Sequence, residues 1–67
     1  MKRQAYQNLY CAVILAADDN DSIIETWATY ADNIREAREL FEDEHAIGAY
    51  EKNYGHIKVM FRLMKRG

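Results

Sequence analysis

The side chains best suited to catalysis in this sequence are its single cysteine, Cys11, and its two histidines, His45 and His56. Nucleophilic catalysis by a cysteine needs an accessible thiolate with a histidine beside it. Cys11 lies inside a stretch rich in Val, Ile and Leu, which is typical of a β-strand. We therefore interpret Cys11 as a small apolar side chain on the core face of that strand.

Two spacings are similar to those of metal sites but lack essential ligands. Residues 18–22 place oxygen ligands at alternate positions, as a calcium loop does, but Thr29 stands where such a loop has its bidentate glutamate. Glu42 and His45 have the Glu-x-x-His spacing of di-iron proteins, which require several facing helices to complete the site. We expect no catalytic residue, no metal and no cofactor.

Size and composition predict a single small domain over residues 1–67. The chain is 49% apolar and has a formal net charge of −2, which is typical of a folded protein and not of a nucleic-acid binder. A domain of this length buries only about 60% of its unfolded surface, so association with a partner or a second copy is expected. One cysteine excludes a disulfide within the chain and favours a reducing cytoplasm. No apolar run approaches the roughly 20 residues that span a bilayer.

The first half of the chain predicts a β-hairpin. Tyr6–Ala17 and Ser22–Ala31 are rich in β-branched and aromatic residues, which favour strands. The polar stretch of residues 18–21 between them is typical of a tight connection.

The second half predicts one helix and a third strand. Asp32 and Asn33 supply a helix N-cap, and Gly48 is a plausible stop. Ala49–Tyr54 is either a loop or a short extra turn, and strict apolar–polar alternation follows Gly55. The apolar stripe of the helix consists of Ile34, Ala37, Leu40, Phe41 and Ile47. We therefore predict an α+β fold of order β-β-α-β, in which one helix packs on one face of a three-stranded antiparallel or mixed sheet.

The first strand is apolar on both sides, although a sheet covered by one helix should have one polar face. We expect the side of Cys11 to face the helix. Symmetric closure of the hairpin then places Trp27 beside Ala12 on the open face, whereas a bulge would turn Trp27 into the core. The open face is predicted to be an aromatic and apolar binding patch with basic residues at its edge: Tyr6, Tyr10, Ile14, Trp27, Met60 and Arg62, with Lys58.

Carboxylates gather toward the end of the predicted helix, at Glu39, Glu42, Asp43 and Glu44. The helix dipole disfavours negative charge at this end. The group is therefore either a solvated helix end or a patch that recognises a partner protein with a basic surface.

These observations favour a non-enzymatic protein-interaction module, a small inhibitor or regulator that binds a larger protein and can act as a homodimer. The same layout occurs in unrelated small proteins, including ribosomal accessory domains and phage-encoded inhibitors, and layout alone does not fix function. One alternative is nucleic-acid binding, with open-face aromatics stacking on bases and basic residues meeting phosphates. Another is a small enzyme at a dimer interface that uses His45 or His56 for acid–base chemistry.

Overall fold

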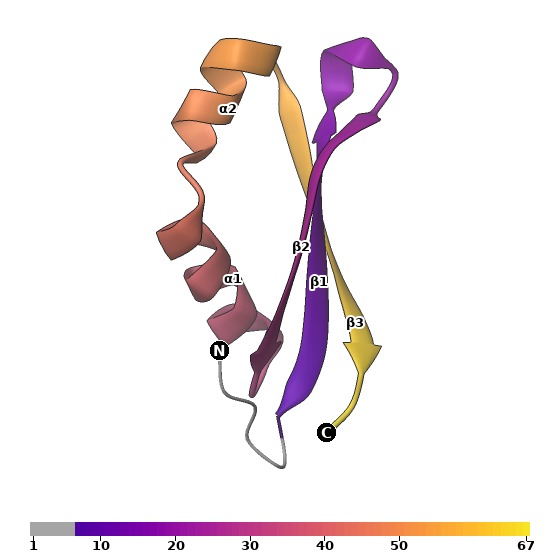
Figure 1. The fold of residues 1–67 in the computed structure, drawn as a ribbon, viewed down its shortest axis with the longest axis vertical. Helices are drawn as coiled ribbons and strands as arrows, with labels where there is room; N and C mark the ends of the chain where they lie inside the picture. The colour runs from indigo at the N-terminus through magenta and orange to yellow at the C-terminus, as the bar shows by residue number, and fades with distance from the viewer. Residues whose placement is uncertain (1–6) are drawn as a thin grey trace.

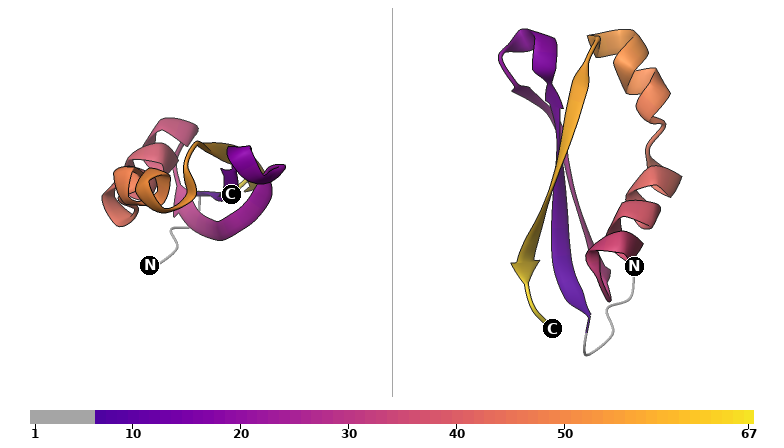
Figure 2. Two further views of the ribbon diagram at one scale, coloured as in Figure 1. Left: turned by 90° about the horizontal axis from the view of Figure 1, so that it is seen from above. Right: turned by 180° about the vertical axis from the view of Figure 1, so that it is seen from behind.

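The computed structural model describes residues 7–67, and its three strands form one antiparallel sheet in the order β2-β1-β3. Both helices lie on one side of this sheet (Figures 1 and 2). The α+β class predicted from the sequence is confirmed. In chain order the elements are β1 (Asn8–Ala16), the 3-10 turn η1 (Ala17–Asp19), β2 (Ser22–Ala31), α1 (Ile34–Glu44), α2 (Ile47–Tyr54) and β3 (Ile57–Lys65).

The hairpin between β1 and β2 has largely the predicted register. Ala12 pairs with Trp27 and Ile14 with Glu25, as symmetric closure requires. A bulge then shifts the pairing by one residue, so that Leu15 lies opposite Ile23 and not Ile24. The turn itself contains Asn20 and Asp21 with φ near +56°, a left-handed conformation that short polar side chains tolerate.

The prediction of one helix is wrong, because the helical region is divided into α1 and α2. The start is as expected, since Asn33 caps α1 by accepting a hydrogen bond from the Glu36 amide at 2.9 Å. The end is not, because His45 and Ala46 leave the helical conformation and Gly48 lies inside α2. The ring Nδ1 of His45 lies 2.9 Å from the Phe41 carbonyl, so a side chain satisfies a backbone group that continued helix would have paired.

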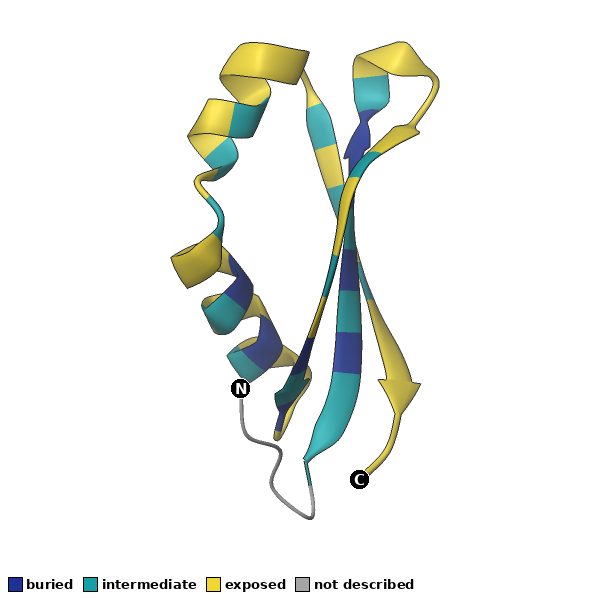
Figure 3. Ribbon diagram, in the orientation of Figure 1, coloured by how far each residue is buried: buried dark blue, intermediate teal, exposed yellow. Residues whose placement is uncertain are grey.

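The core lies between β1 and the helices. Tyr10, Ala12 and Ile14 are buried on the helix-facing side of β1, and Ala37 and Phe41 are buried on α1 (Figure 3). Complete burial of Ile14 and Phe41 contributes roughly 1.5–3 kcal/mol each. The core therefore uses mainly the helix-facing side of the central strand; on the other side Leu15 is also buried, with 9% of its surface exposed.

Candidate interaction surface

The open face of the sheet is built on the side chains of β1 that point away from the helices. Directly opposite residues of antiparallel strands lie on the same face, so the register defines the rows across the sheet. From β2 through β1 to β3 these rows are Ala28–Cys11–Arg62, Thr26–Val13–Met60 and Ile23–Leu15–Lys58. The centre of the open face is therefore the apolar line Cys11, Val13 and Leu15.

Large apolar side chains on the open face are exposed. Ile23 is 67% exposed, Met60 59% and Met64 55%. A shallow hollow of about 430 Å³ lies along β1 and β3 on this side, lined by Cys11, Val13, Leu15, Met60, Phe61, Arg62 and Met64. A contiguous apolar surface of this kind is characteristic of a binding site.

The charged side chains of the open face are basic and lie on β3. Lys58 is paired, with its Nζ 3.2 Å from the Asp21 Oδ2. Arg62 lies beside the hollow and forms no ion pair with any residue in the range 7–67. The open face thus combines an apolar floor with a guanidinium that is available to a partner.

The prediction that Tyr10, Ile14 and Trp27 lie on the open face is wrong. Tyr10 is 7% exposed and Ile14 is fully buried, both on the helix side. Trp27 is half-buried there, where its ring meets the Phe41 ring edge-on at a centroid distance of 5.4 Å. Cys11, expected toward the helix, is half-buried and lines the open-face hollow instead.

The physical reason for this correction is the pairing of β1 with β3. The helix-facing side of β3 was predicted correctly, because Val59 and Phe61 pack against the core. Their partners across the sheet are Ile14 and Ala12, which bring Trp27 to the same side. The hairpin fixes the register of β2, whereas β3 joins β1 from far along the chain. Local sequence patterns therefore do not show which side of β1 lies on the same face of the sheet as the apolar side of β3.

The remaining residues of the predicted surface are divided between two regions. Met60 and Arg62 are exposed on the open face, as expected. The carboxylates of α1 are exposed on the helix layer, and Tyr6 lies outside the described residues. The sequence does not predict four residues of the open face: Cys11, Val13, Leu15 and Met64. The alternation of β3 places Met64 on the same side as Lys58, and pairing this side with Cys11, Val13 and Leu15 of β1 would have identified all four.

The carboxylates of α1 differ in their contacts. Glu44 accepts a hydrogen bond from the indole Nε1 of Trp27 at 3.2 Å, so it helps to hold α1 on β2. Glu39, Glu42 and Asp43 are exposed and remain available as a separate acidic stretch.

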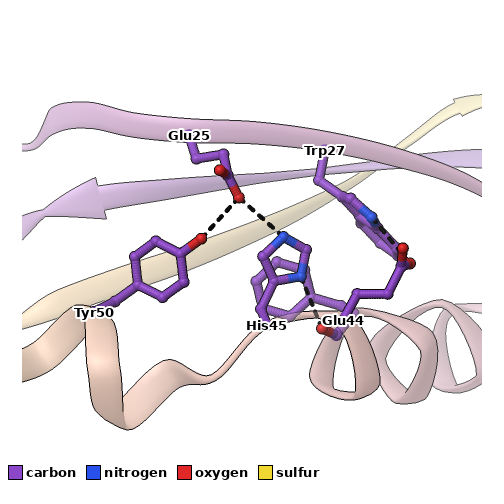
Figure 4. A network of polar contacts seen from close by, with 6 residues as sticks. Glu25, Trp27, Glu44, His45 and Tyr50 are labelled. Carbon is purple, nitrogen blue, oxygen red and sulfur yellow. Dashed lines mark hydrogen bonds and ion pairs between the residues drawn. The ribbon is translucent and has the colours of Figure 1, made fainter.

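A polar network on the helix side joins β2 to the break between the helices (Figure 4). The Glu25 Oε2 lies 3.0 Å from the His45 Nε2 and accepts a hydrogen bond from the Tyr50 hydroxyl at 2.9 Å. This hydrogen bond raises the pKa of Tyr50 above its ordinary value, because the carboxylate favours the protonated phenol. The His45 ring also stacks on Phe41 at a centroid distance of 4.2 Å.

The network is built to fix the helices. Both ring nitrogens of His45 have protein partners, and its side chain is 7% exposed. A buried histidine with contacts at both ring nitrogens is held in one orientation, as a structural connection requires. We therefore interpret Glu25, His45 and Tyr50 as a structural connection between α1, α2 and β2.

Asp18 forms a second connection, between the hairpin turn and the start of β3. Its Oδ2 accepts hydrogen bonds from the His56 amide at 3.1 Å and from the His56 Nδ1 at 3.2 Å. The amide hydrogen bond, followed by the ring hydrogen bond, lowers the pKa of Asp18 below its ordinary value of 3.8. His56 is thus a partner of the turn.

Comparison with known proteins adds no functional assignment. The chain matches no protein-family model, and no curated protein or solved structure matches it. Within residues 7–67 no three His, Cys, Asp or Glu side chains gather closely enough to hold a metal ion. No helix in that range is both long and apolar enough to cross a membrane. The geometry of the open face is therefore the basis for a functional proposal.

Proposed function

We propose that this chain is a non-enzymatic protein-interaction module, a small regulator or inhibitor that docks on a larger protein through its open sheet face. The observation that carries the proposal is the apolar line Cys11, Val13 and Leu15, which lies on the side of the sheet away from both helices. Cys11 and Val13 are half-buried, and Leu15 is buried beneath its neighbours on the adjacent strands. Exposed methionines at 60 and 64 extend this line. Methionine side chains adapt to irregular surfaces, which suits a docking site.

The area of the open face favours a larger partner over a second copy. Three strands of about nine residues cover roughly 30 Å by 14 Å, or about 400 Å², at the usual rise and strand spacing. A stable interface of standard size uses about 800 Å² of each partner. A symmetric dimer through the open face alone would be small, whereas a larger protein can also contact the edges of the sheet.

Nucleic-acid binding through the open face receives less support. A base-stacking platform needs exposed aromatic rings beside basic residues. Tyr10 and Trp27 lie on the helix side, and Tyr30, opposite Leu9, remains as an aromatic residue of the open face. The net charge of −2 also opposes binding to phosphates.

Affinity capture from the native host, with matched variants, tests the proposed surface. Met60→Glu places a charge in the open face at little cost to folding, because Met60 is 59% exposed. We expect this variant to retain at least tenfold less of the captured protein than wild type. Tyr54→Glu is the control, because Tyr54 is 49% exposed on α2, away from the open face.

A parallel variant, Glu39→Lys with Glu42→Lys, measures the contribution of the acidic stretch on α1. If this variant loses capture while Met60→Glu retains it, the docking surface lies on α1 and the proposal is overturned. Sedimentation of the wild-type chain alone at micromolar concentration shows whether a second copy competes for the open face.

A further inference from the structure

The strand β3 is an edge of the sheet. Its inner side pairs with β1 in regular register from Ile57 to Leu63, and no strand within residues 7–67 lies beyond it. The right-hand view of Figure 2 shows no other element of this range in front of it. Proteins usually protect such an edge with charged side chains, with proline, with a bulge or with a covering segment. On β3 the protection consists of basic side chains and of a register shift near its end, opposite Leu9. The sequence from Ile57 to Leu63 contains neither proline nor glycine.

A hollow lies beside β3 on each face of the sheet. On the open face the hollow of about 430 Å³ includes Met60 and Met64. On the helix side a hollow of about 510 Å³ includes Val59 from β3 and Arg38 and Phe41 from α1. A strand placed next to β3 would direct alternate side chains to opposite faces, and so toward the two hollows in turn.

The charges around this edge favour an acidic partner. Lys58, Arg62 and Lys65 lie on β3, and this strand has no acidic residue. Lys58 is paired with Asp21, whereas Arg62 forms no ion pair within residues 7–67. On the helix side, the Arg38 guanidinium stands 5.2 Å from the centre of the Phe61 ring, and Glu42 lines the same hollow with opposite charge. The excess of positive charge beside β3 therefore lies on the open face. Opposite charges across neighbouring strands stabilise pairing, and like charges destabilise it. The same cations disfavour pairing of β3 with β3 of a second copy.

We propose that β3 receives an extended segment of the partner protein, in which acidic and apolar residues alternate, as a fourth strand of the sheet. Backbone hydrogen bonds to the free edge supply affinity. Alternation places all carboxylates of the segment on one face, where Arg62 selects them, and its apolar side chains on the helix side. This inference rests on the proposed function, because it describes how the partner engages the same surface. It also extends the contact beyond the limited area of the open face.

A synthetic peptide tests this mode of binding without knowledge of the partner. The probe is a capped nine-residue peptide of alternating glutamate and valine, and its control has lysine in place of glutamate. Binding is measured by titration in NMR spectra, with amide hydrogen exchange along β3. We expect the glutamate peptide to bind at least tenfold more tightly than the lysine peptide. We also expect it to slow exchange at alternate amides between Ile57 and Leu63.

Charge reversal provides the decisive variant. Arg62→Glu should reduce the preference for the glutamate peptide at least tenfold and improve binding of the lysine peptide. Lys52→Glu, the same charge change on an exposed residue of α2, should leave both affinities unchanged. Substitutions at exposed positions rarely disturb folding, and the circular dichroism of each variant checks that both remain folded.

Three results would overturn the inference. The peptides could bind equally, the glutamate peptide could bind without protecting the amides of β3, or β3 could gain protection on raising the protein concentration alone, which would make a second copy the occupant. If the glutamate peptide does not bind but Met60→Glu still reduces capture of the host protein, strand pairing is rejected and the docking surface stands. Failure of both would reject the proposed function as well.

Discussion

At the scale of the residue, Gly55 has a backbone conformation that few other residue types can adopt. It ends α2 with φ of +77° and ψ of −140°, a region that side chains rarely enter. A Cβ at this position would lie 2.7 Å from the Asp18 Oδ2, the atom that accepts both hydrogen bonds from His56. The lack of a side chain thus permits the connection between the hairpin turn and β3.

Replacing each of two glycines by alanine should have opposite effects. Gly55→Ala should lower the free energy of unfolding by about 1–3 kcal/mol, because it forces a strained backbone and displaces Asp18. Gly48→Ala should raise it by up to about 1 kcal/mol, because Gly48 lies in α2 and a Cβ there would meet no atom of another element of residues 7–67 within 4 Å. Urea denaturation measures both. An unchanged stability of Gly55→Ala would contradict this account of the corner.

The Asp18 carboxylate should make stability depend on acid pH. Its pKa in the folded protein is below the unfolded value, so its stabilising contribution is present above about pH 4 and is lost as the pH falls through the folded pKa. Asp18→Asn should therefore be less stable than wild type at pH 7, and the difference should shrink toward pH 2. Urea midpoints across this range measure the effect. A difference that stays constant over the range would show that ionisation of Asp18 is not its source.

At the scale of the element, the sequence predicted what is local and failed where distant segments meet. The strands, the N-cap at Asn33 and most of the β1–β2 register follow from nearby residues. The break after Glu44 coincides with the contact of His45 with Glu25 on β2, which helical periodicity does not predict. The side of β1 that the helices cover depends on β3. The sequence therefore shows that β1 is apolar on both sides, but it does not show that the side of Cys11 forms the open face.

A pair of substitutions tests the corrected assignment of the faces. Trp27→Ala should lower the free energy of unfolding by about 2–4 kcal/mol, somewhat less than for a fully buried tryptophan, because the ring packs on Phe41 and His45. Met60→Ala should change it by less than about 0.5 kcal/mol, because Met60 is exposed. Thermal or urea denaturation gives both values. The reverse order would restore Trp27 to the open face.

At the scale of the whole molecule, residues 7–67 form one helix layer and one sheet, and no element of this range covers the far side of the sheet (Figure 1). Stable domains bury the apolar face of each layer against another layer. Here a partner protein would supply the missing layer, and its added strand would extend the sheet beyond β3. A chain of 67 residues gains stability from such association, because its own core is small.

Cys11 offers the most direct test of the claim that the open face is the docking surface. It is the single cysteine, it is half-buried, and it lies in the central apolar line. The measurement is the rate of Cys11 alkylation by iodoacetamide in the free chain and in the complex with the captured host protein. We predict that the complex reacts at least tenfold more slowly. An alkylation rate that is the same in the complex and in the free chain would contradict the proposed surface.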